Sequence, residues 1–151
     1  MQMKLTFIGA DHEVTGSCHF LEVGASKVLI DCGMEQGNNV YQNAELPVSY
    51  REIDYVFLTH AHIDHAGMLP WIYARGFRGQ VIATYATVDL CNIMLKDSAH
   101  IQEMEAEWKN RKARRAGRVE VEALYTMEDA ESVLKHFEGV AYGQEFKLNN
   151  D

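Results

Sequence analysis

The 151-residue sequence has little of what membrane, disulfide-rich and disordered proteins need. It holds three cysteines and two prolines, and no apolar run approaches the ~20 residues that span a bilayer. The cysteines cannot all pair with one another, and none forms a CxxC motif. The start, MQMKLTFIGA, lacks the basic region, long apolar stretch and cleavage site of a secretory signal. We therefore expect a reduced, cytoplasmic protein without a membrane partner, whose 47% hydrophobic residues form the core of one domain.

Basic residues are scarce except in one place. Residues 109–118 (KNRKARRAGR) hold six of the fourteen Lys and Arg residues and no acid, in a chain of net charge −8. Such a stretch on an acidic protein is suited to contact with phosphates. The alternative is a solvated face at the end of a helix, where cations complement the helix dipole. Charge alone slightly favours this second interpretation.

Apolar patterning predicts strands first and then alternating strands and helices. Short apolar runs predict strands at residues 3–8, 18–23, 27–31, 53–58 and 81–85, with a hairpin connection at 24–26 and a long loop at 33–50. Three- and four-residue apolar spacing predicts helices at residues 69–74, 88–112 and 126–137, the last with Thr126 as N-cap. Residues 140–142 and 145–148 are expected to form a final hairpin. This order predicts an α/β sandwich.

The strongest chemical signal is residues 59–67 (THAHIDHAG), where three histidines and one aspartate follow a predicted strand. Imidazole nitrogens and carboxylate oxygens are the ligands that Zn²⁺ and similar cations prefer. His60 and His62, two apart in extended backbone, are expected to face one side and hold one ion. Asp64 and His65 are expected to serve a second ion. The alternative is capping of the next helix, which Asp64 alone could perform, although it leaves the histidines unexplained.

An HxHxDH segment after a strand resembles the signature of the metallo-β-lactamase fold hydrolases. Residues 9–18 (GADHEVTGSC) are similar to the opening of their β-CASP branch, which consists of RNA- and DNA-processing nucleases. Residues 29–33 (LIDCG) and 59–70 (THAHIDHAGMLP) resemble the first and second motifs of that branch. Residues 97–102 (DSAHIQ) resemble a stretch of its bacterial members. The resemblance covers essentially the whole chain and is loose after residue 106.

The resemblance implies a metallo-β-lactamase-type αββα sandwich, of which the chain is the N-terminal half. It implies phosphodiester hydrolysis with two Zn²⁺ ions, or Mn²⁺, the first held by His60 and His62 and the second by Asp64 and His65. It also places Asp64 and Asp31 in the catalytic machinery, with Asp31 hydrogen-bonding a ligand or a water. Taken alone, Asp31 is equally well interpreted as a turn residue. The family's later ligands and its cap domain are not among these residues, so we expect the chain to be inactive alone.

Three functions remain open at this point. The first is a metal-dependent nuclease acting on single-stranded RNA, which residues 13–18 (EVTGSC) and the basic stretch favour. The second is a lactamase-fold hydrolase of a small ester, lactone or thioester. The third is a non-catalytic fragment that binds a partner or dimerises. An uncovered sheet face predicts self-association, by isologous packing or by exchange of segments 88–112 and 126–148.

Other residues near the motifs receive weaker predictions. The resemblance brings His100 near the cleft, although composition alone favours a residue on the helix surface. His12 lies in a loop that would border a substrate groove. Glu13, Thr15 and Ser17 are candidates for positioning a phosphate, although such residues also form ordinary turns. Cys18 and Cys32 are expected to be small buried packing residues.

Overall fold

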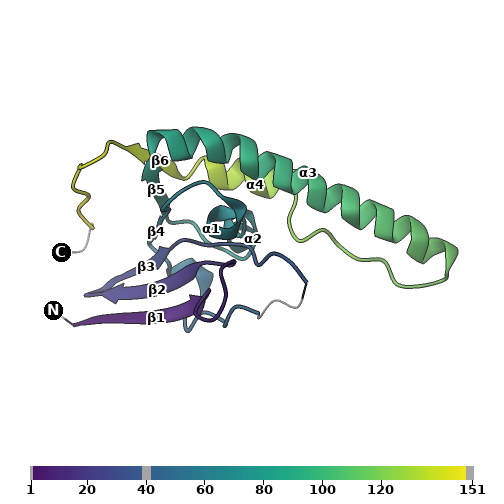
Figure 1. The fold of residues 1–151 in the computed structure, drawn as a ribbon, viewed down its shortest axis with the longest axis horizontal. Helices are drawn as coiled ribbons and strands as arrows, with labels where there is room; N and C mark the ends of the chain where they lie inside the picture. Colours follow the sequence, from purple (N-terminus) through teal and green to yellow (C-terminus); the bar gives the residue numbers. More distant parts are fainter. Residues whose placement is uncertain (1, 39–41, 149–151) are drawn as a thin grey trace.

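A six-stranded sheet with strand order β1-β2-β3-β4-β5-β6 forms the centre of the fold (Figure 1). The computed structural model describes residues 2–38 and 42–148. The strands are β1 (Met3–Gly9), β2 (Cys18–Val23), β3 (Ser26–Ile30), β4 (Tyr55–Phe57), β5 (Gln80–Thr84) and β6 (Phe137–Val140). β1, β2 and β3 pair antiparallel, whereas β3, β4, β5 and β6 run parallel. The carboxyl ends of β3, β4 and β5 therefore share one edge of the sheet.

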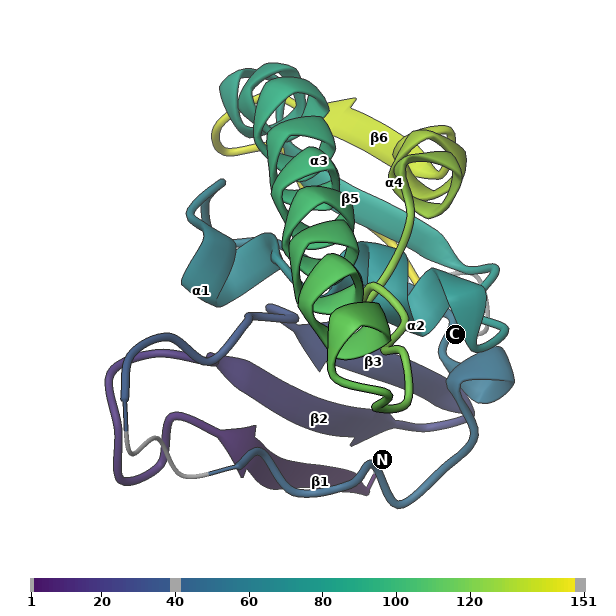
Figure 2. The ribbon, with the colours of Figure 1, turned by 90° about the vertical axis from the view of Figure 1, so that its right-hand side faces the viewer.

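Helices cover one face of this sheet. They are α1 (Ile63–Ala66), α2 (Leu69–Ala74), α3 (Tyr85–Arg115) and α4 (Met127–Leu134), with a 3₁₀ turn η1 (Tyr50–Glu52) before β4. Figure 2 looks along α3 and shows the four helices in front of the sheet. The α/β class predicted from the sequence is confirmed.

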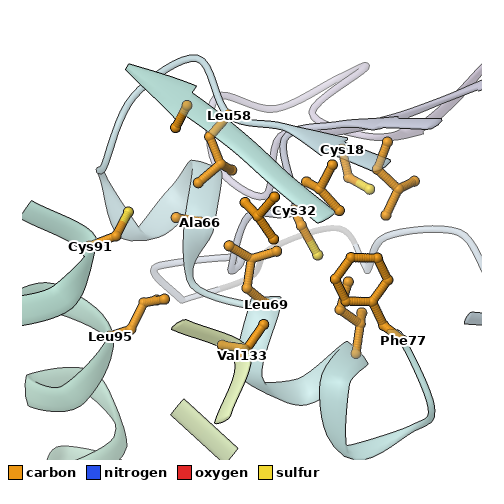
Figure 3. Packing of buried hydrophobic residues seen from close by; sticks show 14 of the residues in the cluster. Cys18, Cys32, Leu58, Ala66, Leu69, Phe77, Cys91, Leu95 and Val133 are labelled. Carbon is orange, nitrogen blue, oxygen red and sulfur yellow. The ribbon is translucent and has the colours of Figure 1, made fainter. Parts of the chain in front are cut away.

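The core lies between the sheet and these helices. Phe20, Leu29 and Val56 on the sheet are fully buried against Leu69 of α2 and Leu95 of α3. Figure 3 shows Cys18 and Cys32 in the same cluster. All three cysteines are free and buried, and Cys18 and Cys32 are packing residues as expected.

The opposite face of the sheet is only partly covered. Val28, Tyr55 and Ile82 form a second, smaller apolar cluster there, and Phe146 and Leu148 from the C-terminal segment pack against it. At the edge of the sheet, Met3, Leu5 and Phe7 of β1 stay 65%, 48% and 60% exposed. Alternate residues of β1 thus leave apolar side chains in water.

Element boundaries depart from the sequence predictions in the first half of the chain. The hairpin connection has two residues, since Val23 pairs directly with Ser26, and Gly24 takes the positive φ of 55° that the turn requires. The predicted strand 53–58 is shortened because Ile53 caps η1. Tyr85 begins α3 instead of ending β5.

The predictions for the last third were partly wrong. Thr126 is the N-cap of α4, as expected, and forms a capping box with Asp129. The helix ends at Leu134, however, because Phe137 starts a strand that pairs parallel with β5. The hairpin predicted for 140–142 and 145–148 does not form. Residues 137–140 add to the free edge of β5, and residues 145–148 have no strand structure.

The long helix α3 is correct in place and extends three residues beyond the predicted range at each end. Its buried residues are Thr87, Cys91, Leu95, Ser98 and Ala99. The apolar residues whose spacing predicted the helix instead face solvent, with exposed side chains at Leu90, Ile93, Ile101, Met104 and Trp108. Figure 1 shows the C-terminal half of α3 extending beyond the sheet. Across the described residues, no helix is long and apolar enough to cross a membrane.

Candidate metal centre

The histidine cluster lies at the carboxyl ends of β3 and β4. Asp31 follows β3 directly, and residues 58–62 connect β4 to α1. The Asp31 amide donates to the carbonyl of Phe57 at 2.9 Å, which holds the two strand ends together. Carboxyl ends of neighbouring parallel strands are the usual place for a binding site in an α/β sheet.

Backbone contacts fix α1 against the loop that follows β3. The Cys32 amide donates to the His65 carbonyl at 2.7 Å, and the Ser17 amide donates to the Asp64 carbonyl at 2.9 Å. Between these bonds lies Gly33, where a Cβ atom would stand 1.7 Å from the Asp64 carbonyl oxygen. The position therefore requires glycine because the two backbones touch.

Asp31 is the centre of the hydrogen-bond network. The residue is 2% exposed and adopts a positive φ of 60°. Its carboxylate accepts hydrogen bonds from the Thr59 amide (2.8 Å), the Thr59 hydroxyl (2.9 Å) and His65 Nδ1 (2.8 Å). The Ser17 hydroxyl donates to it at 3.3 Å. This carboxylate therefore joins both loops and one candidate metal ligand.

The network also assigns the protons of two histidines. Because an ionised carboxylate only accepts, we assign a proton to His65 Nδ1, and in the neutral tautomer this assignment leaves the lone pair of Nε2 free. The single proton of the Thr59 hydroxyl goes to Asp31, so this hydroxyl accepts from His60 Nδ1 at 2.9 Å. His60 therefore also keeps its Nε2 lone pair free. One carboxylate thus sets the tautomer of His65 directly and that of His60 through Thr59.

The four predicted ligands lie together. The ring centroid of His60 is 4.8 Å from that of His62 and 4.0 Å from that of His65. His65 Nε2 is 3.5 Å from Asp64 Oδ2. Capping does not account for this cluster, because the N-cap residue His62 makes no side-chain capping hydrogen bond.

The donor chemistry of this cluster fits a metal, but its donors do not yet converge. Three imidazoles and one carboxylate are a ligand set that suits Zn²⁺. Among residues 2–38 and 42–148, however, no group of three or more His, Cys, Asp or Glu side chains is arranged to hold an ion. The His60 and His65 rings pack against each other at an interplanar angle of 47°.

The remaining predicted residues lie elsewhere or act differently. His12 is exposed beside Asp11, and His100 is exposed on α3. Ser17 is buried and donates to Asp31, so it is not available to a phosphate. Thr15 bonds with the backbone of Gln36. Sequence reasoning missed Thr59 as a functional residue, although a hydroxyl directly before the first histidine was a signal.

A separate apolar cavity of about 450 Å³ opens beside Cys18 and Cys32 and is lined also by Met34 and Trp71. A hydrogen bond with the Cys18 side chain, together with burial, raises the pKa of the Cys32 thiol. A raised pKa disfavours the thiolate that a metal needs. Cys32 therefore belongs to the packing below the metal centre and not to its ligands.

Comparison with known proteins adds independent information. The family model described as the metallo-beta-lactamase superfamily matches residues 13–132, which include Asp31 and the whole histidine cluster. A ribonuclease of Thermus thermophilus is 38% identical over 147 residues, covering 97% of this chain and 30% of that protein. Transcription termination factor FttA of Methanocaldococcus jannaschii is 30% identical over 144 residues, covering 93% of this chain and 20% of that protein. Cleavage and polyadenylation specificity factor 73 of Drosophila melanogaster is 30% identical over 147 residues, covering 95% of this chain and 19% of that protein. The chain thus spans less than a third of the length of these relatives.

Proposed function

The chain belongs to the metallo-β-lactamase superfamily and to its β-CASP nuclease branch, and from this we propose that it serves the metal-dependent hydrolysis of phosphodiester bonds in RNA. A relative that aligns with nearly the whole chain is a ribonuclease. Single-stranded RNA is the proposed substrate, because its phosphates are accessible and its backbone can enter an open strand-end site.

The observation that carries the proposal is the bond from His65 Nδ1 to the buried Asp31 carboxylate. Histidines that bind metals commonly donate their other ring nitrogen to a carboxylate, which fixes the ring and its tautomer. The Thr59 hydroxyl fixes the ring of His60 in the same way, because it accepts from His60 Nδ1 and donates to Asp31. A buried carboxylate joined to two histidines in this way is typical of support for metal ligands.

The proposal assigns His60 and His62 to one divalent ion and Asp64 and His65 to another, with Zn²⁺ first and Mn²⁺ as the alternative metal. Bound divalent ions supply Lewis acidity, which activates water and offsets the charge of a phosphate. Asp31 keeps the Nε2 atoms of His60 and His65 free for this role and holds their rings in place. Because Asp31 is 2% exposed, bulk water does not compete for its hydrogen bonds.

The test is cleavage of an end-labelled single-stranded RNA by the full gene product, with chelator and then with added Zn²⁺ or Mn²⁺. Metal-dependent cleavage that disappears in His62→Ala supports the proposal, with His12→Ala as the matched control because His12 is exposed outside the cluster. RNA left intact while a thioester or small ester is hydrolysed would overturn it in favour of the second function class. We expect the chain alone to be inactive, because it offers only two ligands to each ion, whereas a stable zinc site normally uses at least three protein ligands.

We also propose the cytoplasm as the place of action. The three cysteines are all free and buried, as in proteins of reducing compartments. Protein isolated from cells with a disulfide, detected as a mass loss of two hydrogen atoms per disulfide, would argue against this compartment.

A further inference from the structure

The exposed end of α3 carries one face that joins an aromatic ring with cations. We propose that this face, formed by Trp108, Arg111, Lys112 and Arg115 and called the tryptophan face below, binds single-stranded RNA outside the metal centre. The inference rests on the proposed function, because it assigns a second contact to the same substrate class. It interprets the basic stretch as a contact for phosphates, although charge alone slightly favours a solvated helix end.

The spacing places these four residues on one side of the helix. They recur at i, i+3, i+4 and i+7, which are neighbouring positions on an α-helical surface. The exposed residues Ile101 and Met104 continue the same side toward the N-terminus. The face is therefore continuous along more than two turns.

Ion pairing separates the cations of this end into two groups. Lys109 pairs with Glu105 at 3.7 Å, and Arg114 pairs with Glu120 at 2.8 Å. In the described part of the chain, Arg111, Lys112 and Arg115 form no ion pair. In that part of the chain, the three cations of the tryptophan face thus lack an acidic partner, as does Arg118 beyond the end of the helix.

The chain that returns from α3 occupies a different side of the helix. The Asn110 side chain bonds with both the amide and the carbonyl of Val121, at 2.7 and 2.8 Å. Arg114 reaches Glu120 on the same returning segment. Asn110 lies about 160° around the helix from Trp108, at 100° per residue. The returning segment therefore leaves the tryptophan face open, and Figure 1 shows this end of α3 standing away from the sheet.

Trp108 gives the face a means to bind a base. Its side chain is 52% exposed, and Lys112 Nζ stands 3.5 Å over the ring centroid. Aromatic side chains beside cations are the recurring way in which proteins hold single strands, because bases stack on the ring while cations contact phosphates. An acidic protein surface would match the cations but would not require an exposed indole.

The position of this face sets what it does. α3 begins at the carboxyl end of β5, and Trp108 lies about 35 Å along the helix from Tyr85 at a rise of 1.5 Å per residue. A nucleotide bound at Trp108 is therefore not the one being cleaved. The face would hold a distant part of the same RNA and raise its concentration at the metal centre.

The test measures binding of fluorescein-labelled U20 RNA to the 151-residue chain by fluorescence anisotropy, in chelator, at a series of salt concentrations. Arg111→Ala/Arg115→Ala is compared with Lys109→Ala/Arg114→Ala, which removes the same charge from the paired cations of the same helix. We expect the first pair to reduce the slope of log K against log salt by about 1.4, near 0.7 per lost phosphate contact, and the control pair to leave it nearly unchanged. Trp108→Ala should weaken binding about tenfold. In a Trp71→Phe background, U20 should quench the fluorescence of Trp108.

The outcomes separate this inference from the proposed function. The inference is overturned if the two double variants reduce the salt slope of U20 binding equally. It is also overturned if the Trp108→Ala variant binds U20 normally. A dimer that dissociates in Arg111→Ala/Arg115→Ala without any change in U20 binding overturns it in favour of a second copy of the chain as occupant. If U20 binding follows the expected pattern but the gene product cleaves no RNA with any metal, the tryptophan face is supported and the proposed function fails. If His62→Ala abolishes cleavage while the two double variants bind U20 equally well, the proposed function stands and the inference fails.

Discussion

His65 Nδ1 lies 2.8 Å from Asp31 Oδ2, so a histidine of the cluster is held by a carboxylate thirty-four residues earlier in the chain. This bond ties α1 to the end of β3. Asp31 holds a left-handed backbone conformation, with φ at 60°, which costs a non-glycine residue on the order of 1–3 kcal/mol. The four hydrogen bonds that its carboxylate accepts offset this strain. The same residue therefore shapes the loop and orients the site.

Asp31→Asn should keep the fold and weaken metal binding. Asparagine tolerates a positive φ and nearly preserves the shape of the side chain. Its amide lacks the negative charge that orders the Nδ1 protons of His65 and His60, so the affinity of the chain for Zn²⁺ should fall about 10- to 100-fold. Competition with a chromophoric chelator at neutral pH measures this change.

Asp31→Ala is the comparison variant. It leaves the buried Ser17 hydroxyl and the part-buried Thr59 amide without their acceptor, which should lower the free energy of unfolding by about 1–3 kcal/mol in urea melts. If Asp31→Asn bound Zn²⁺ as tightly as the original chain, Asp31 would have only a structural role.

Thr59→Val should release the tautomer of His60 without changing the volume of residue 59. Valine cannot accept from His60 Nδ1, so the proton of that ring should redistribute to Nε2. Nitrogen-15 NMR of labelled histidine in the metal-free chain reports the two tautomers separately. Thr59→Ser retains the hydroxyl and should retain the original spectrum. Identical spectra for the valine and serine variants would contradict the relay from Asp31 to His60.

Gly33→Ala should disturb the metal centre although residue 33 contributes no side chain to it. The added Cβ would stand 1.7 Å from the Asp64 carbonyl, so the backbone of α1 must move away from the loop after β3. We expect a loss of about 1–3 kcal/mol in unfolding free energy and weaker Zn²⁺ binding. Gly117→Ala is the matched control, because a Cβ there meets nothing within 4 Å. It does carry a positive φ of its own, so a loss in stability but not in Zn²⁺ binding is expected of it.

The sequence was sufficient for the strand before the cluster, whereas α1, which carries Asp64 and His65, was not predicted. The strand before Thr59 and the short-range grouping of His60, His62, Asp64 and His65 are local features, and the structure brings those side chains together as the spacing suggested. Their role as metal ligands remains a prediction. The partners of Asp31 were less accessible, because they lie 14 to 34 residues away and depend on the pairing of β3 with β4.

The errors have a common physical origin. The stripe that begins at Leu90 and ends at Trp108 has the period of an amphipathic helix, yet the core contacts of α3 come from Cys91, Leu95 and Ala99. A period identifies a helix but not which of two adjacent apolar faces meets the sheet. Likewise, Phe137 was predicted to end a helix but begins β6, which pairs with the free edge of β5. A pairing between segments distant in the sequence leaves no local signal.

Cys91 should make stability depend on pH in the alkaline range. Burial raises the pKa of its thiol from 9.0 to about 11. Because the folded-state pKa is the higher one, the associated stability is fully present below pH 9 and is lost as pH rises toward 11. The melting temperature should therefore fall over this interval. In Cys91→Ala, the fall relative to the variant's own melting temperature at pH 8 should be smaller.

Iodoacetamide at pH 8.5 should modify Cys91 slowly in the folded chain and rapidly in urea. Equal rates in both conditions would show that the thiol is not held neutral.

Self-association through β1 is expected at micromolar concentration. Met3, Leu5 and Phe7 lie on the face that the helices do not cover, on a strand at the edge of the sheet. Neighbouring exposed apolar side chains and an unpaired edge both favour contact with a second copy. Exchange of α3 and α4 between copies is not needed to form the core, because Cys91, Leu95 and Val133 already pack in their own chain. We therefore expect isologous packing of two β1 strands.

Sedimentation velocity should show a dimer for the original chain and a monomer for Phe7→Glu. Val14→Glu, at an apolar residue that is 86% exposed outside the sheet, should remain dimeric. A monomer at all concentrations, with a cooperative melt, would show that this apolar face is stable in water.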